Sequence, residues 1–253
     1  MEQTLREIFY SHNDRLIHKW DHYFEIYERY FSKYRGNSLN VLEIGVSQGG
    51  SIQLWKKYFG DKLNLYSVDI NPECKLFEKD TTKLYIGSQE DPVFLEKLYA
   101  ELPEMDIIMD DGGHSMKQQI LTFEHLFLKV KEGGVFLVED THTSYWYHFG
   151  GGLRKRGSFI EYSKKMIDSL YKSHLTNTKG IRVDNLTDHI KSISFYDSIV
   201  VFEKGKRPDP FHIKVGNPSI KDFLTKGSIW SAIKTKLFRM SDSTFRSNFK
   251  NNP

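Results

Sequence analysis

Met105-Asp-Ile-Ile-Met-Asp-Asp-Gly-Gly-His114 and Gly134-Val-Phe-Leu-Val-Glu-Asp-Thr-His142 each contain a short apolar run that ends in a pair of acidic residues. Short apolar runs without alternation are typical of central parallel strands that are covered on both faces. The carboxyl ends of parallel strands meet at one edge of a sheet, so we expect Asp111, Glu139 and Asp140 to lie together there. Three hard oxygen donors at one edge predict a divalent-metal site, and the histidine that closes the first run is a candidate base beside it.

The same alternation of apolar and helix-like runs extends along the chain. Strands are expected at 39–46, 63–70, 83–87, 105–110 and 135–139, and helices at 21–31, 50–59, 92–102, 115–130 and 159–175. Two further strands, 191–196 and 198–204, are joined by a tight turn around Asp197, so they must be antiparallel. The pattern predicts an α/β fold with a doubly wound, mostly parallel sheet and a terminal antiparallel hairpin.

The composition is that of an ordinary globular protein. The 253 residues are 39% hydrophobic and 27% charged, and a single cysteine, Cys74, excludes an internal disulfide and a thiolate metal cluster. We expect a helical lead-in over residues 1–36, the sheet domain over 37–205 and a basic C-terminal extension over 206–253. The first residues lack the apolar core of a secretory signal, so a cytoplasmic setting is expected.

The charge is unevenly distributed. From Lys204 onward the chain has 11 basic and 3 acidic residues, whereas the remainder has 25 basic and 30 acidic residues. Within this tail, residues 228–240 predict a helix with one apolar face and lysines on the other. A membrane interface, an anionic substrate, a partner subunit and a solvated extension are all compatible with such a tail.

A glycine-rich loop, Leu42-Glu-Ile-Gly-Val-Ser-Gln-Gly-Gly-Ser51, follows the first expected strand and opens a helix. Asp69 ends the second expected strand, 24 residues after Gly45, where a carboxylate can accept hydrogen bonds from a ribose diol. A simple tight turn with an exposed acid would look similar, but the combination favours a nucleoside-containing cofactor. The spacing is not G-x-G-x-x-G, and Glu43 disfavours a pyrophosphate and suits a cationic ligand.

The two acidic pairs also have a simpler explanation. Acids near a helix N-terminus are favourable by about 0.3–1 kcal/mol, so Asp110 and Asp111 could serve only the helix that begins near Ser115. The second pair could likewise form an ordinary turn at a strand end. However, three carboxylates packed together without a cation would raise one another's pKa and cost stability, which favours the metal interpretation.

The E-x-G loop resembles motif I of the class I S-adenosylmethionine-dependent methyltransferases, and the strand pattern looks like their seven-stranded, Rossmann-like sheet. The DDGGH run at 110–114 and the VED run at 138–140 narrow the resemblance to the metal-dependent sugar O-methyltransferases of macrolide biosynthesis and the related cephamycin and rhamnosyl O-methyltransferase group. The lead-in from Lys19 to Glu28 is similar as well. The resemblance covers roughly residues 15 to 145, so it does not extend to the acceptor or the assembly.

The resemblance implies a role for each site residue. The implied ligands of Mg²⁺ (or Mn²⁺) are Asp111, Glu139 and Asp140, and the implied general base is His114, with His142 as a second candidate. The implied contacts of S-adenosylmethionine are Glu43, Gly45, Ser51 and Asp69 along its loop and ribose, Ser88 and Gln89 at its adenine, and Tyr23 and His22 at its methionine end. Asp110 could replace Asp111 as a ligand or contact the amino group of the cofactor.

The implied activity is S-adenosylmethionine- and divalent-metal-dependent O-methylation of a sugar hydroxyl. The acceptor would be a nucleotide-activated sugar, such as a deoxysugar or heptose of a surface polysaccharide, or a glycosylated natural product. Tyr145, Trp146, Tyr147 and Phe149 are expected to contact the acceptor, and Arg154, Lys155 and Arg156 to bind a phosphate if it is nucleotide-linked.

Three alternatives stay open. A nicotinamide-dependent oxidoreductase is opposed by the glycine spacing, a catechol-type O-methyltransferase would use similar metal chemistry, and a non-catalytic membrane-binding module would rely on the basic tail. We expect a homo-oligomer with a sugar-containing small-molecule partner and no nucleic-acid partner.

Overall fold

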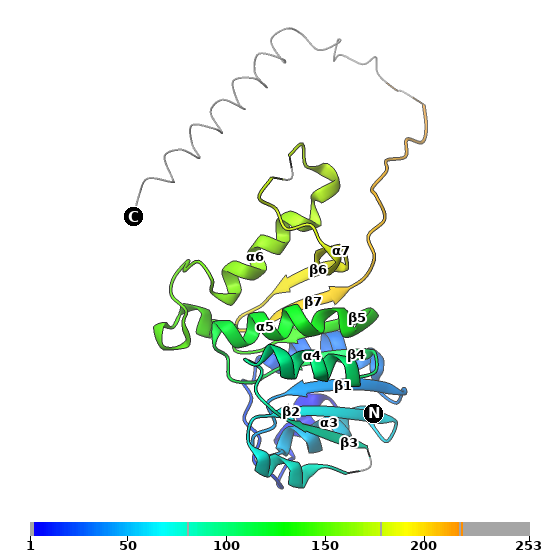
Figure 1. Cartoon of the computed structure of the whole chain (residues 1–253). Helices are drawn as coiled ribbons and strands as arrows, with labels where there is room; N and C mark the ends of the chain where they lie inside the picture. Colours follow the sequence, from blue (N-terminus) through cyan, green and yellow to red (C-terminus); the bar gives the residue numbers. More distant parts are fainter. Residues whose placement is uncertain (1–2, 80, 178, 218, 220–253) are drawn as a thin grey trace. The chain divides into compact units, whose positions relative to one another are not determined.

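A seven-stranded sheet forms the centre of the chain, in a computed structural model that describes residues 3–79, 81–177, 179–217 and 219. The strands lie in the order β3-β2-β1-β4-β5-β7-β6 (Figure 1). Their bounds are Leu39–Ile44 (β1), Leu63–Asp69 (β2), Thr82–Ile86 (β3), Met105–Asp110 (β4), Val130–Val138 (β5), Ile190–Phe195 (β6) and Val200–Lys204 (β7). The first five are mutually parallel, and β7 pairs antiparallel with both β5 and β6. The predicted doubly wound sheet with a closing hairpin is confirmed.

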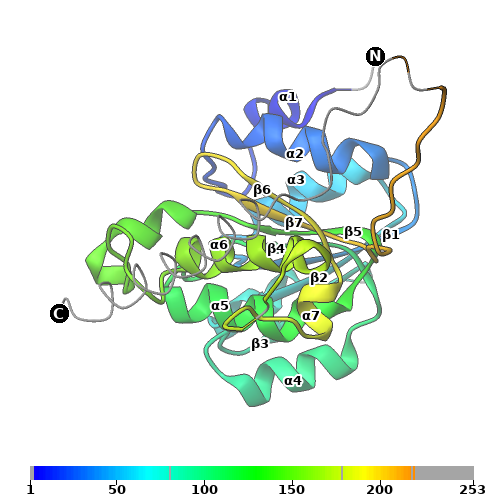
Figure 2. The same cartoon turned by 90° about the horizontal axis from the view of Figure 1, so that it is seen from above.

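Helices cover both faces of the sheet (Figure 2). Their bounds are Leu5–Tyr10 (α1), Tyr23–Phe31 (α2), Gly50–Phe59 (α3), Pro92–Glu101 (α4), Met116–Leu126 (α5), Phe159–Leu170 (α6) and Asn185–Asp188 (α7). Successive strand residues point to opposite faces, so neighbouring residues contribute to different cores. Val41 and Ile107 pack in the core beneath α1, α2 and α3, whereas Leu42 and Ile108 pack in the core beneath α4, α5 and α6.

Capping residues begin the helices that flank the site. Asp91 accepts a hydrogen bond from the Val93 amide at the start of α4, where Pro92 supplies a preset φ. Ser115 and Gln118 form a reciprocal capping box at the start of α5. These caps determine where the loops after β3 and β4 end, and therefore where their side chains emerge.

Two element boundaries differ from the sequence expectation. The helix expected at 115–130 ends at Leu126, and β5 begins at Val130 rather than at 135, with an irregular register opposite β4. Gly134 lies inside this strand. A Cβ there would come within 2.7 Å of the Asp106 carbonyl oxygen, so the glycine permits the close approach of β5 to β4. The helix expected at 159–175 ends at Leu170, whose carbonyl accepts a hydrogen bond from Arg207.

The chain divides into a compact unit over Met1–Asp209 and a second unit over Pro210–Pro253. Most of the second unit, including the amphipathic helix expected at 228–240, lies outside the described residues. Among the residues that the structure describes, no helix has the length and apolar character needed to cross a membrane.

Candidate metal and cofactor site

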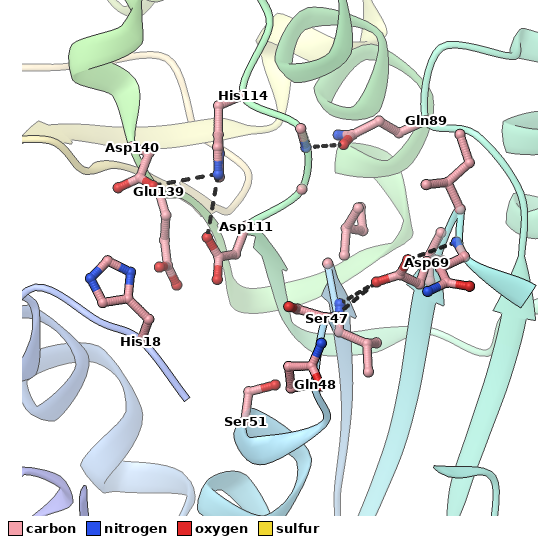
Figure 3. A pocket seen from close by; sticks show the side chains of 18 of the residues that line it. His18, Ser47, Gln48, Ser51, Asp69, Gln89, Asp111, His114, Glu139 and Asp140 are labelled. Atoms are coloured by element: carbon pink, nitrogen blue, oxygen red, sulfur yellow. Dashed lines mark hydrogen bonds and ion pairs between the residues drawn. The ribbon is translucent and has the colours of Figure 1, made fainter. Parts of the chain in front are cut away.

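A cavity of about 600 Å³ lies at the carboxyl ends of β1, β2, β4 and β5 (Figure 3). The order of the strands reverses at β1, which pairs with β2 on one side and β4 on the other, and ligands of open α/β sheets bind at such points. Residues 16–20, here called the strap, line the cavity opposite the sheet. Directly before the strap, the amide of Arg15 donates to the side chain of Gln53 on α3.

The glycine-rich loop is shaped by Gly45 and Asp69. Gly45 has a φ of 92°, and a Cβ there would lie 2.0 Å from the carbonyl oxygen of Asp111, so only glycine fits. Asp69 Oδ2 accepts hydrogen bonds from the amides of Val46 (2.8 Å) and Ser47 (2.9 Å). Asp69 therefore holds the loop open, and it lines the cavity as expected of a ribose contact. That contact stays a prediction.

Glu43 lies behind the cavity wall. Its carboxylate is 1% exposed and accepts hydrogen bonds from Ser51 Oγ (2.9 Å) and Trp55 Nε1 (2.8 Å). Burial raises the pKa of Glu43 to about 7, and the positive charge of Lys19 partly offsets that rise. Ser51 lines the cavity, so in this structure Glu43 reaches the cavity through Ser51.

Gln89 organises the turn after β4. Its Nε2 donates to Asp110 Oδ1 and to Thr122 Oγ1, both at 3.0 Å, and its Oε1 accepts from the Gly113 amide at 2.8 Å. Asp110 is 1% exposed and burial raises its pKa to about 6. Gln89 and Ser88 both line the cavity, whereas Asp110 is held behind it.

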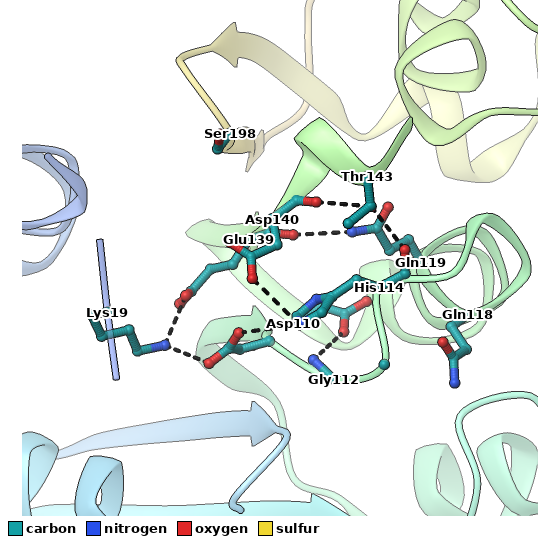
Figure 4. Close-up of polar contacts among 12 residues, drawn as sticks. Lys19, Asp110, Gly112, His114, Gln118, Gln119, Glu139, Asp140, Thr143 and Ser198 are labelled. Carbon is teal, nitrogen blue, oxygen red and sulfur yellow. Dashed lines mark hydrogen bonds and ion pairs between the residues drawn. The ribbon is translucent and has the colours of Figure 1, made fainter. Parts of the chain in front are cut away.

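The acidic cluster contains a cation from the chain itself, which the sequence reasoning missed. Lys19 Nζ lies 2.6 Å from Asp111 Oδ2 and 2.7 Å from Glu139 Oε2 (Figure 4). The Lys19 side chain is 3% exposed and that of Glu139 is 1% exposed. Burial lowers the pKa of Lys19, but the two carboxylates together raise it by more than burial lowers it. The pKa of Lys19 is therefore raised overall, and the ammonium stays charged. The pKa of Glu139 is raised by burial and by Asp111, against the opposing effect of Lys19.

A second group of ligand atoms surrounds Asp140. Asp111, His114 and Asp140 each offer an atom within 4.8 Å of the others, and His114 Nε2 lies 3.4 Å from Asp140 Oδ2 and 3.9 Å from Asp111 Oδ1. Tyr23 donates from its hydroxyl to Asp140 Oδ1 at 2.5 Å. His114 and Asp140 both have positive φ, at 57° and 51°, a strained conformation that is common at functional sites.

The donors present fit a divalent cation. Carboxylate oxygens suit Mg²⁺ or Mn²⁺. His114 Nδ1 is buried and has no hydrogen-bond partner among the described residues, so it retains capacity for a ligand. The expected set of Asp111, Glu139 and Asp140 thus lines one cavity, but the structure groups His114 rather than Glu139 with the two aspartates.

The candidate bases differ in position. His114 lines the cavity, whereas His142 Nδ1 lies 4.0 Å from Asp140 Oδ1 and borders a second hollow. His125, inside α5, is bonded through Nδ1 to the Leu121 carbonyl, which indicates a structural role. His22 contacts the Asp197 carbonyl rather than the cavity. The geometry favours His114 as the group that faces a ligand.

No protein-family model matches the chain. Demethylmacrocin O-methyltransferase of Streptomyces fradiae is 32% identical over 71% of this chain and 47% of its own length. Mycinamicin VI 2''-O-methyltransferase of Micromonospora griseorubida is 29% identical over 72% of this chain and 48% of its own length. The 8-demethyl-8-alpha-L-rhamnosyl tetracenomycin-C 2'-O-methyltransferase of Streptomyces olivaceus is 29% identical over 72% of this chain and 50% of its own length. The chain therefore spans about half the length of these relatives.

A solved structure extends the comparison. The methyltransferase MycE from the mycinamycin biosynthetic pathway, in complex with Mg and SAH, superposes with a TM-score of 0.71 at 27% identity, over 81% of this chain and 55% of the other. By sequence and by fold, the chain belongs with the S-adenosylmethionine-dependent methyltransferases that are related to the macrolide and tetracenomycin sugar O-methyltransferases.

Proposed function

We propose that the chain transfers the methyl group of S-adenosylmethionine to a hydroxyl of a sugar-containing acceptor, and that the reaction needs a bound divalent cation, Mg²⁺ or Mn²⁺. The observation that carries the proposal is that one cavity is lined both by the loop around Gly45 and Asp69 and by the cluster of Asp111, His114 and Asp140. The cofactor's methyl group and an acceptor hydroxyl can therefore meet inside a single space.

Two comparisons support the proposal. The three relatives are O-methyltransferases, and the one from Streptomyces olivaceus acts at the 2' position of a rhamnosyl compound. The mycinamycin-pathway enzyme binds Mg and SAH, and it has been solved with mycinamycin VI as well. The cofactor and metal proposed here match those groups.

Asp111, Glu139 and Asp140 would hold the cation, and Tyr23 would keep Asp140 in place through its hydroxyl hydrogen bond. A divalent cation, when bound there, lowers the pKa of an alcohol that is otherwise near 16. His114 then accepts the hydroxyl proton at Nε2, a task suited to an imidazole, whose pKa is near neutral. The acceptor oxygen attacks the methyl carbon as the bond from carbon to sulfur breaks, which leaves a neutral thioether. The strap lines the cofactor side of the cavity and would shield a bound cofactor there.

Binding and transfer experiments test the proposal separately. Calorimetric titration of the full chain with S-adenosylhomocysteine and with NAD⁺ should give binding for the first alone, and the reverse result would favour an oxidoreductase. Transfer of label from [methyl-¹⁴C]S-adenosylmethionine is then measured with rhamnosides, nucleotide sugars and catechol as acceptors, with Mg²⁺ or with EDTA. Labelling of catechol alone, or labelling that EDTA leaves unchanged, would contradict the proposal.

A further inference from the structure

The chain between β5 and α6 includes a loop over residues 146–157, here called the outer loop, which stands out from the sheet beside the start of α6 (Figures 1 and 2). The amide of Gly151 donates to the Trp146 carbonyl at 3.0 Å, and the amide of Gly152 donates to the Ser144 carbonyl at 2.8 Å. These hydrogen bonds fold the loop back on itself. The surface that it presents is therefore set by its own backbone.

The outer loop exposes large apolar side chains. Trp146, Tyr147 and Leu153 are 45%, 83% and 78% exposed. Of the four aromatic residues expected to contact the acceptor, Tyr145 lines the second hollow. The other three, which include Phe149, line neither that hollow nor the cofactor cavity. Exposed apolar side chains gathered in one place mark a surface that binds a partner or a membrane.

Three cations lie beside these apolar side chains. Arg154, Lys155 and Arg156 are exposed, and among the residues that the structure describes none of the three has an ion-pair partner. They were expected to bind the phosphate of a nucleotide-linked acceptor, but they line neither the cofactor cavity nor the second hollow. A Cβ on Gly152 would lie 3.3 Å from Cε1 of Tyr147 and 3.4 Å from Cδ of Lys155, so an aromatic ring and a cationic side chain adjoin there.

The charge and shape of the outer loop select among possible partners. Its cations stand out, because residues 1–203 together have 25 basic and 30 acidic residues. A nucleic acid needs a longer track of cations and aromatic faces that are free for stacking, whereas the Trp146 ring already stacks on His148 with the ring centroids 5.7 Å apart.

A lipid surface matches the loop better, because it contacts only what projects from a protein. Tryptophan and tyrosine rings lie at the headgroup level of a membrane, and aliphatic side chains reach below that level. Lysine and arginine attract anionic headgroups. The outer loop offers all three kinds of side chain in one projecting segment.

We infer that the outer loop docks the protein on an anionic membrane surface, with Leu153 inserted among the headgroups and the cations of residues 154–156 against lipid phosphates. This docking is a property separate from methyl transfer. The loop is close to the acidic cluster, because the Trp146 ring lies 4.7 Å from the His142 ring and His142 Nδ1 lies 4.0 Å from Asp140 Oδ1. Docking would therefore hold the cluster near the membrane surface.

Co-sedimentation of the full chain with phosphatidylcholine vesicles, with and without phosphatidylserine, tests the inference. The chain should bind the vesicles that contain phosphatidylserine and should not bind the neutral ones. Each basic side chain near an anionic surface improves affinity about fivefold, so combined Arg154→Gln, Lys155→Gln and Arg156→Gln should weaken binding roughly a hundredfold.

The matched control removes the same charge outside the loop. Lys75→Gln, Lys97→Gln and Lys117→Gln change three lysines that are exposed elsewhere on the chain. Charges that do not touch the membrane are screened by salt, so this control should weaken binding by less than about tenfold.

A fluorescent probe reports insertion. Leu153→Cys, labelled with an environment-sensitive dye, should shift its emission to the blue when phosphatidylserine vesicles are added, because the dye enters a less polar layer. The same dye on Val93→Cys, at an exposed position of α4, should not shift. The native Cys74 is buried and therefore protected from labelling.

Equal vesicle binding by the native chain and the triple loop variant would overturn the inference and assign the contact to another part of the chain. An unshifted dye at position 153 would overturn the inserted arrangement. Binding of an oligothymidylate, but not of vesicles, that the triple loop variant loses would assign the loop to a nucleic acid. A fall in sedimentation mass of that variant without vesicles would assign it to a second copy of the chain.

Discussion

Replacement of Lys19 by methionine removes the internal cation of the acidic cluster while it keeps most of the apolar stem. In the native chain the ammonium lies 2.6 Å from Asp111 and 2.7 Å from Glu139, and its side chain is 3% exposed. Removal of one partner from a buried ion pair costs about 3–5 kcal/mol, because the remaining charge is left uncompensated. In a unit of this size that corresponds to a fall in Tm of roughly 6–20 °C.

The effect should depend on pH and on metal. The folded-state pKa of Glu139 is raised above its unfolded value of 4.5, so its contribution to stability is present below pH 4.5 and is lost as the pH rises through the folded pKa. Loss of Lys19 raises that folded pKa further. Because the folded pKa of Glu139 is about 8, the deficit of Lys19→Met should be larger at pH 8 than at pH 5 and should grow further above pH 8, and saturating Mg²⁺ should reduce it by supplying another cation.

Thermal melts by circular dichroism, at pH 5 and pH 8 and with EDTA or Mg²⁺, measure these differences. Lys75→Met is the matched control, because its ion pair with Glu78 is exposed and such pairs contribute at most about 1 kcal/mol. Lys19→Arg should retain most of the stability. The control variant should itself lower the Tm by up to about 2 °C. If Lys19→Met lowers the Tm by no more than that at pH 8 in EDTA, Lys19 does not neutralise the cluster.

Three further changes test single contacts. Gly45→Ala should weaken S-adenosylhomocysteine binding at least tenfold, measured by calorimetry, because the new Cβ would clash with the Asp111 carbonyl at 2.0 Å; unchanged affinity would contradict the loop geometry. His114→Ala should leave the Kd for S-adenosylhomocysteine within about twofold and lower kcat by 10²-fold or more, whereas His125→Ala should keep the native kcat; equal rates for the two variants would remove His114 as the base. Gln89→Ala should lower the Tm by several degrees by freeing the Gly113 amide and Asp110, and an unchanged melt would show that this turn is held by other contacts.

The placement of the acidic residues at one sheet edge could be predicted from sequence because it depends only on strand order and strand ends. The face of the sheet toward which each acidic side chain points follows from the alternation of side chains along a strand. Glu43 has the parity of Val41 and faces the core beneath α3, and Asp110 has the parity of Ile108 and faces the core beneath α5. Both are therefore held behind the cavity wall.

Lys19 could not be predicted from local pattern. It is 92 residues from Asp111 and 120 residues from Glu139, and it precedes the first strand in a segment without regular secondary structure. Apart from the resemblance of the lead-in that begins at Lys19, the available signal was electrostatic. Three carboxylates in one place need a cation, and this chain provides one from its strap in addition to any bound metal. The early start of β5 was not predicted because Gly133 and Gly134 usually break a strand. Here Gly133 adopts a positive φ of 81°, and Gly134 permits the close approach of β5 to the Asp106 carbonyl of β4.

We expect the acidic cluster beside the cofactor cavity to bind one divalent cation. Titration of the EDTA-treated chain with Mn²⁺, followed by electron paramagnetic resonance with S-adenosylhomocysteine present, measures this directly. The chain should bind one Mn²⁺ tightly, excess Mg²⁺ should displace it, and Asp111→Asn and Asp140→Asn should each weaken its binding at least tenfold. Absence of a tight Mn²⁺, or full Mn²⁺ affinity in both variants, would contradict this expectation.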